Sequence, residues 1–321
     1  MFNPKSILYF IGFAIALCQP IQTQNIAPTL TATGNQGYCP LNQINIVTDF
    51  DISDEDDTEI EGLFVQISTG YVQREDSLTL TGSHPTIVTS WSVVEGKLTL
   101  KGIAGALVSY TDLIAAIKDV VFQSTSNQPS DKGFSITIGD ANYLPQTGHY
   151  YEYVPALGIT WTDAKVAAEN KTYFGLQGYL ATITSAEEAQ LSGEQAAGAG
   201  WIGGSDSETD DVWKWVTGPE AGTIFWNGEI GGSTPNFAFW NADEPNDWGG
   251  GENYAHVTAP GIGVPGSWND LTNTGASSGP YQPKGYIVEY GGMPGETAPD
   301  ISASTNIYYK NNKYHTSNNL R

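Results

Sequence analysis

The chain has 321 residues, of which 13 are basic and 35 are acidic, so its net charge at pH 7 is −22. Nucleic-acid binding needs clustered Lys and Arg to neutralise phosphates, and the sequence has no such cluster, so the composition argues against nucleic acid and favours a cation as partner. A hydrophobic content of 40% with 37 Gly and 17 Pro indicates a folded protein rich in turns and excludes disorder throughout.

The N-terminus has the pattern of a secretory signal peptide. Lys5 precedes an apolar run, residues 7–17, which Cys18-Gln-Pro20 ends. The run is too short to span a bilayer, so we expect residues 1–24 to be removed and the protein to be secreted or held at the cell surface, without a transmembrane segment. A lipid-anchored Cys18 is the alternative, which the large Leu17 disfavours. Cys39 is then the one remaining cysteine, so no intramolecular disulfide can form.

Residues 25–142 have the alternation of β-strands. Leu63, Val65 and Ile67 recur at period two, and similar pairs follow along the segment, so we expect an all-β sandwich. One helical pattern interrupts it over Tyr110–Val121, where apolar residues recur at helix spacing.

An acidic loop in this segment, together with Asp140-Ala-Asn142 at its far end, resembles the cadherin-like repeats of bacterial surface proteins. Its acidic residues are Asp49, Asp51, Asp54, Asp56 and Asp57. Carboxylates spaced in this way can hold Ca²⁺. A solvated acidic loop is an equally good interpretation, because Asp54 stands where a calcium-binding helix-loop-helix needs Gly.

The texture of the sequence changes after a short linker, residues 143–148. Eight of the nine Trp lie beyond residue 160, and two helices are predicted, one after Thr160 with Asp163 closing its capping box and one after Ser185 with Glu188. The expected strands are Tyr179–Ile183, Trp201–Gly203, Trp213–Val216, Asn253–Val257 and Tyr286–Tyr290. We therefore expect an α+β domain over residues 149–292, followed by a flexible tail, residues 293–321.

A loop of 41 residues, 227–267, is too long for a structureless connection and should serve a function. Oxygen donors gather in it and in the next strand, as Glu244-Pro-Asn246-Asp247, Glu252-Asn253 and Trp268-Asn269-Asp270. No His or Cys is among them. Hard oxygen ligands on flexible loops select Ca²⁺ or Mg²⁺ over zinc, and five or more of them suit Ca²⁺.

With these motifs in order, residues 148–292 resemble a C-type lectin-like domain. The resemblance rests on the two capped helices, Leu180-Ala-Thr-Ile, Trp201-Ile-Gly-Gly, Glu244-Pro-Asn, Gly251-Glu-Asn, Trp268-Asn-Asp and Tyr286-Ile-Val-Glu. It implies an α+β C-type lectin-like fold with two helices, antiparallel strands and a long calcium-binding loop, preceded by the all-β sandwich. The two disulfides of the family are absent, which suggests a bacterial extracellular relative.

The resemblance also implies a set of calcium ligands. The sugar-binding Ca²⁺ would be held by Glu244, Asn246, Glu252, Asn269 and Asp270, with Pro245 in the cis form between the first two. A second, structural Ca²⁺ would be held by Asp206, Asp210 and Asp247, with the neutral Asn253 where relatives often have Asp.

In this family, the order Glu-Pro-Asn is associated with binding of sugars that have equatorial 3- and 4-hydroxyls, such as mannose, glucose or N-acetylglucosamine. Trp248 leaves galactose open, because galactose-binding relatives place a Trp near this position to stack on the sugar. We therefore expect glycans as partners, with Glu244, Asn246, Trp248, Glu252 and Asn269 contacting the sugar. The protein is interpreted as a calcium-dependent lectin in adhesion or glycan capture.

Two alternatives remain open. The domain could be a calcium-stabilised structural or protein-protein adhesion module that binds no sugar. A glycosidase is disfavoured because carboxylates bound to Ca²⁺ are poor proton donors, so we expect no enzyme.

The hydrolase-like pattern Gly275-Ala-Ser277-Ser-Gly279 lies in a loop and is rejected. His256 alternates with apolar residues and is interpreted as a core histidine.

Overall fold

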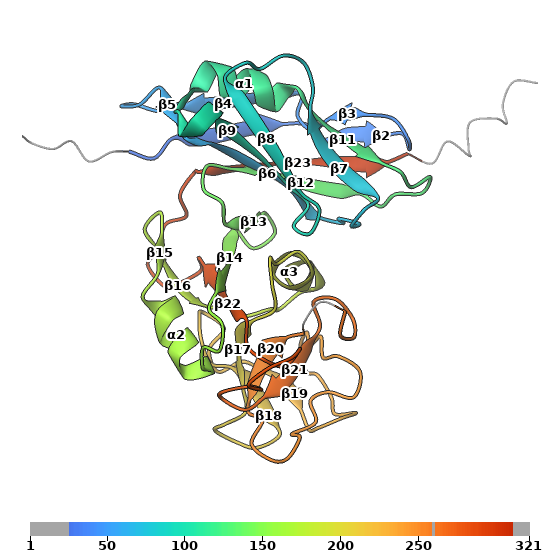
Figure 1. Ribbon diagram of the computed structural model, residues 1–321, viewed down its shortest axis with the longest axis vertical. Helices are drawn as coiled ribbons and strands as arrows, with labels where there is room; N and C mark the ends of the chain where they lie inside the picture. Colours follow the sequence, from blue (N-terminus) through green and yellow to red (C-terminus); the bar gives the residue numbers. More distant parts are fainter. Residues whose placement is uncertain (1–25, 259–260, 311–321) are drawn as a thin grey trace, which may run out of the picture.

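The computed structural model describes residues 26–258 and 261–310, and in it the chain forms two lobes joined end to end (Figure 1). Residues 1–24, the predicted signal peptide, lie outside the described residues, as do residues 311–321 of the predicted tail. Strands dominate both lobes, and helices are few.

The described part of the first lobe consists of mainly antiparallel sheets and one α-helix. Its largest sheet has the order β2 (Gln36–Tyr38), β23 (Ser302–Tyr309), β12 (Lys132–Thr137), β6 (Gly62–Thr69), β9 (Lys97–Gly102) and β8 (Ile87–Ser92). A three-stranded sheet has the order β3 (Ile44–Asn45), β11 (Val120–Ser124) and β7 (Asp76–Leu80). The pairs β1 (Thr29–Thr33) with β4 (Asp49–Ser53) and β5 (Glu59–Ile60) with β10 (Val108–Ser109) complete it, beside a single 3-10 turn, Ile103–Gly105.

The core of the first lobe follows the predicted alternation. Leu63, Val65 and Ile67 on β6 are fully buried in one apolar cluster with Phe134 and Ile136 of β12. Burying each such side chain contributes on the order of 1.5–3 kcal/mol.

The predicted helix is present but shorter than expected. Helix α1 (Tyr110–Lys118) begins where Ser109 accepts the N–H of Asp112. It ends before Val120 and Val121, which belong to β11, so the predicted end at residue 121 is wrong. Two consecutive buried Val favour a strand over the last turn of a helix.

The predicted flexible tail is wrong for the residues of β23. This strand pairs antiparallel with β12 and parallel with β2, so the chain returns to the first lobe after the second (Figure 1). Ala303 and Ile307 are buried in the apolar cluster of the first lobe. The first lobe therefore does not simply precede the second, because its largest sheet is completed by residues from beyond it.

The second lobe has one ten-stranded sheet. Its main path is β13 (Asn142–Leu144), β14 (His149–Pro155), β22 (Gly285–Tyr290), β17 (Trp201–Ser205), β18 (Val212–Trp215) and β19 (Ile224–Asn227). Attached to that path are β15 (Thr172–Tyr173), β16 (Leu176–Leu180), β20 (Tyr254–Val257) and β21 (Trp268–Leu271). The predicted strand Tyr179–Ile183 is thus displaced, since β16 ends at Leu180.

Both predicted helix starts are confirmed. Helix α2 (Trp161–Glu169) begins after Thr160, whose hydroxyl accepts the N–H of Asp163. Helix α3 (Ala186–Ala189) begins after Ser185 and continues as a π-helical segment, η2 (Gln190–Glu194).

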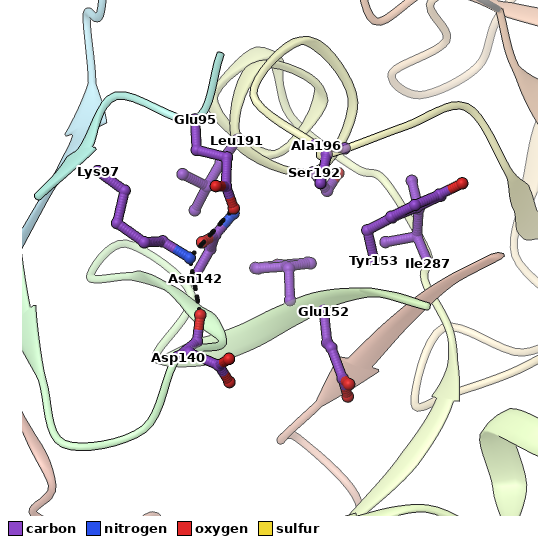
Figure 2. Close-up of a pocket in the computed structure, with 12 residues that line it drawn as sticks. Glu95, Lys97, Asp140, Asn142, Glu152, Tyr153, Leu191, Ser192, Ala196 and Ile287 are labelled. Atoms are coloured by element: carbon purple, nitrogen blue, oxygen red, sulfur yellow. Dashed lines mark hydrogen bonds and ion pairs between the residues drawn. The ribbon is translucent and has the colours of Figure 1, made fainter. Parts of the chain in front are cut away.

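Polar side chains join the two lobes. Gln195 donates from Nε2 to the carbonyl oxygens of Ile67, at 2.9 Å, and of Glu95, at 2.7 Å. Lys97 of the first lobe donates to the Asp140 carbonyl at 2.7 Å and to the Glu95 carboxylate at 3.3 Å. Glu95, Lys97 and Asp140 line one side of a cavity of about 140 Å³, and Tyr153 lies on the other side (Figure 2). The junction is therefore specified by hydrogen bonds to backbone carbonyls as well as by packing.

Candidate metal centre and ligand pocket

An aromatic cluster fixes the strand that carries two of the predicted ligands. Trp268 at the start of β21 is fully buried and packs edge-to-face against Trp215 and Phe225. Strand β21 pairs with β20, which sets Asn269 opposite His256 and Asp270 opposite Ala255. Asn269 and Asp270 are thus held in place by the β20–β21 pair, and each is only 2% exposed.

A cavity of about 500 Å³ opens beside this hairpin. The predicted ligands of the sugar-binding site and the predicted stacking residue all line it, namely Glu244, Asn246, Trp248, Glu252, Asn269 and Asp270. The structure therefore brings together residues from the long loop and from β21 that are up to 26 positions apart in the sequence.

The loop bends at a cis peptide bond between Glu244 and Pro245, as expected. Immediately after the bend, the backbone N–H groups of Asn246 and Asp247 donate to the Asp270 carboxylate, with distances between 2.8 and 3.1 Å. The Asn246 side chain donates to Glu244 Oε2 at 2.6 Å, while its own Oδ1 is buried without a partner among the described residues. Buried polar atoms are rarely left in this state, so the Asn246 oxygen is an acceptor that could serve as a ligand for a cation.

The far end of the loop closes on itself through short-range hydrogen bonds. The Glu252 carboxylate accepts the N–H of Trp248 at 3.0 Å, and Asp247 Oδ1 accepts the N–H of Glu252 at 2.8 Å. The positive φ angles of Gly249, Gly250 and Gly251 form the turn between them. The Trp248 side chain is left 81% exposed at the rim.

Three carboxyl groups lie close together in this pocket. Burial raises the pKa of Glu244 to about 9, and the neighbouring Asp270 and Glu252 add to the shift. Burial also raises the pKa of Glu252 to about 7, again with a contribution from Asp270. Like charges held close together disfavour ionisation, and a bound cation would reverse that effect.

The predicted second site is less complete in its geometry. Asp206 is buried, with Oδ2 accepting the N–H of Asp211 at 3.1 Å and Oδ1 lacking a partner among the described residues. Burial raises its pKa to about 6, with further contributions from Asp210 and Asp270. Asp210 is exposed, and Asp247 is half-buried and already accepts the N–H of Glu252.

The tightest acidic cluster lies in the first lobe. Among the described residues, Asp54, Asp56 and Asp57 are the acidic side chains with one oxygen each within 4.8 Å of one another. The hydroxyl of Tyr110 donates to Asp54 at 2.6 Å and, as the largest cause, lowers the pKa of that carboxyl to about 2. Calcium binding in this loop stays a prediction.

Sequence reasoning missed one wall of the pocket, the segment after β21. Thr272, Gly275, Ala276 and Tyr281 line the cavity beside Leu271. The sequence feature that could have indicated this wall is the long segment between the Trp268-Asn-Asp motif and β22, which has an aromatic residue among Gly and Pro. His256 is buried against Trp201 with ring centroids 5.0 Å apart, as the core interpretation predicted.

Comparison with known proteins finds partial sequence matches, and no family model matches the chain. It is 34% identical over 306 residues to Halomucin of Haloquadratum walsbyi, which covers 89% of this chain and 3% of Halomucin. It is 33% identical over 115 residues to C-type lectin domain family 4 member F of Mus musculus, which covers 34% of this chain and 18% of that protein. The chain thus contains a segment similar to a C-type lectin and spans a small part of each relative.

A solved structure, a calcium-independent type II antifreeze protein, aligns with 48% of this chain and 94% of its own, with 23% identity and a TM-score of 0.33. None of the helices in the described part of the chain is both long and apolar enough to cross a membrane.

Proposed function

We propose that this protein is an exported, calcium-dependent carbohydrate-binding protein whose binding site is the cavity bounded by Glu244 and Asp270. The observation that carries the proposal is the convergence of five oxygen-bearing side chains on one cavity, with the buried Asn246 oxygen lacking a protein partner. Similarity to a mouse C-type lectin supports it.

The donor set fits Ca²⁺. Glu244, Glu252 and Asp270 supply carboxylates, and Asn246 and Asn269 supply amide oxygens, which are the hard ligands that Ca²⁺ takes in sets of six to eight. When all three carboxyl groups are ionised, their charge of −3 exceeds the +2 of one Ca²⁺, and the two amides add neutral oxygen ligands. When bound, the ion would leave coordination positions that two neighbouring sugar hydroxyls can fill.

The chain's own residues would orient the sugar. Carboxylate oxygens accept hydrogen bonds from hydroxyls, whereas the amide groups of Asn246 and Asn269 can donate to them, so each hydroxyl can meet both kinds of partner. The Asp270 carboxylate also holds the backbone after Pro245, which keeps the long-loop ligands beside those of β21. We propose the mannose, glucose or N-acetylglucosamine class, with a galactose-type sugar as the alternative that Trp248 leaves open.

A second Ca²⁺ at Asp206, Asp210 and Asp247 is part of the proposal, and so is export through the N-terminal signal peptide. The buried Asp206 oxygen without a partner is the observation that supports the second ion. A similarity to a protein named as a mucin is compatible with export. We propose no enzymatic activity.

Retention on mannan resin tests the proposal. The full exported chain should be retained with millimolar Ca²⁺, released by EDTA and lost in Asn269→Asp, while Asn127→Asp, an exposed position of the first lobe outside the ligand set, should be retained. Retention that survives EDTA would contradict the lectin proposal. A melting temperature that rises with Ca²⁺ while mannan and galactose resins both fail to retain the protein would instead identify a structural or protein-protein adhesion module.

A further inference from the structure

The binding cavity extends well past the proposed metal ligands. Beyond Asp270, its wall is made of Leu271, Thr272, Gly275, Ala276 and Tyr281. A volume of about 500 Å³ is that of a pocket for a drug-sized molecule, which is larger than one sugar ring. A ligand with a single ring at the metal would leave this part of the cavity to water.

The added wall is held in place by hydrogen bonds. Asn273 ties it to the start of α2, because its carbonyl accepts the N–H of Trp161 at 2.9 Å and its Oδ1 accepts the N–H of Thr162 at 3.0 Å. Within the segment, the Ala276 N–H donates to the Tyr281 carbonyl at 2.9 Å. A wall that is already ordered costs little conformational entropy when a ligand binds.

A glycine lets the segment fold tightly at this point. Gly275 has a φ of 58°, and a Cβ there would approach the Pro283 ring to 2.6 Å. The close approach of Gly275 and Pro283 folds residues 275–283 back on themselves. Tyr281, which lies within this segment, lines the cavity and has 43% of its surface exposed.

The chemistry of this wall suits an uncharged saccharide. Residues 271–283 contain no charged side chain, and the chain as a whole carries a net charge of −22, which disfavours anionic glycans. An aromatic ring presents an apolar face that matches the apolar C–H face of a sugar ring. Gly275, which has no side chain, and Ala276, which has a small one, leave room beside it.

We propose that Leu271, Ala276 and Tyr281 form a second subsite, which binds the next sugar unit of a neutral oligosaccharide whose first unit is held at the Glu244–Asp270 site. The inference rests on the proposed function and specifies its ligand class: neutral chains of two or more units bind more tightly than the single sugar.

Calorimetry with Ca²⁺ on the full exported chain tests this proposal, with methyl α-mannoside and α1,2-mannotriose as probes and N,N′-diacetylchitobiose and maltose as further disaccharides. At least one of the longer ligands should bind about tenfold more tightly than the corresponding monosaccharide. Tyr281→Ala should remove that difference and leave monosaccharide affinity unchanged, whereas Tyr281→Phe should preserve it. Tyr308→Ala is the matched control, since Tyr308 is similarly exposed but lies on β23 in the first lobe.

The outcomes separate the two proposals. Equal affinity for all longer and single sugars would overturn the second subsite and leave the lectin function standing, as would a preference for longer ligands that survives in Tyr281→Ala. If none of the sugars, including galactose and lactose, binds in Ca²⁺, the proposed function itself fails. Thermal unfolding and circular dichroism of the variants verify that each is folded.

Discussion

The carboxylate of Asp270 accepts the backbone N–H of Asn246 at 3.0 Å, although 24 positions separate the two residues. The same carboxylate accepts the N–H of Asp247 at 2.8 Å. Strand β21 is therefore tied to the loop backbone directly after Pro245, and one side chain serves both as a proposed calcium ligand and as the acceptor that shapes the loop.

Replacing Asp270 should separate these two roles. Asp270→Ala leaves two backbone N–H groups without their acceptor, so we expect a loss of about 1–3 kcal/mol in the free energy of unfolding even in EDTA. Asp270→Asn keeps an oxygen acceptor and should recover most of that loss, while calcium affinity falls in both variants. Urea denaturation in EDTA and calcium titration measure the two effects. An alanine variant as stable as the wild type in EDTA would contradict the structural role.

Calcium should stabilise the second lobe by mass action. A ligand at one hundred times its Kd stabilises the folded state by about 2.7 kcal/mol per site. Glu244→Gln should weaken this stabilisation, because it removes a charged donor, whereas Glu229→Gln should not, because Glu229 is exposed and lies outside the ligand set. Calorimetric scans with and without Ca²⁺ measure the effect. Equal shifts in both variants would place calcium elsewhere in the protein.

The sequence was most informative where a local pattern has one structural solution. The capping residues Thr160 and Ser185 and the alternation around Val65 appear in the structure as predicted. These features depend on neighbours along the chain, whose chemistry is readable without knowing the fold. The cis bond at Pro245 also appears, but it was expected from the family resemblance and not from local chemistry.

Long-range features were the ones missed. Strand β23 is rich in Ser, Asn and Thr, so its composition is typical of a tail, and its partners β2 and β12 lie far away in the sequence. The signal was the alternation of Ala303, Thr305 and Ile307, which are buried while their neighbours are more exposed. The wall around Tyr281 was missed for a related reason, because the length and composition of its segment do not say that it will face the proposed calcium ligands.

The position of β23 makes a direct prediction about stability. Ile307 is 1% exposed in the core of the first lobe, so Ile307→Ala should cost about 2–5 kcal/mol. Its neighbour Tyr308 is 47% exposed, and Tyr308→Ala should change the stability by no more than about 0.5 kcal/mol. Urea denaturation of the two variants provides the comparison. If residues 302–309 were a flexible tail, both substitutions would be nearly neutral.

The pair His149 and Glu289 should make the second lobe less stable as the pH rises. His149 Nδ1 lies 2.6 Å from the fully buried Glu289 Oε1. Burial lowers the pKa of His149, but the hydrogen bond to Glu289 outweighs it, so the net shift is upward. Burial is the largest cause of the raised pKa of Glu289, and the hydrogen bond to His149 opposes it.

Both shifts have the same consequence for stability. A histidine whose pKa is higher in the folded state contributes its full stabilisation below about pH 6.5 and loses it as the pH rises through the folded-state pKa. The raised pKa of Glu289 likewise makes the folded state hold protons that the unfolded state releases. His149→Gln should flatten the fall in melting temperature between pH 6 and 8, and it should also lower stability by about 3–5 kcal/mol at pH 6, because Glu289 then lacks its ionic partner. Melting curves at several pH values in EDTA isolate this effect from calcium binding. A wild-type melting temperature that does not fall over this interval, or that falls as steeply in the variant, would refute the assignment.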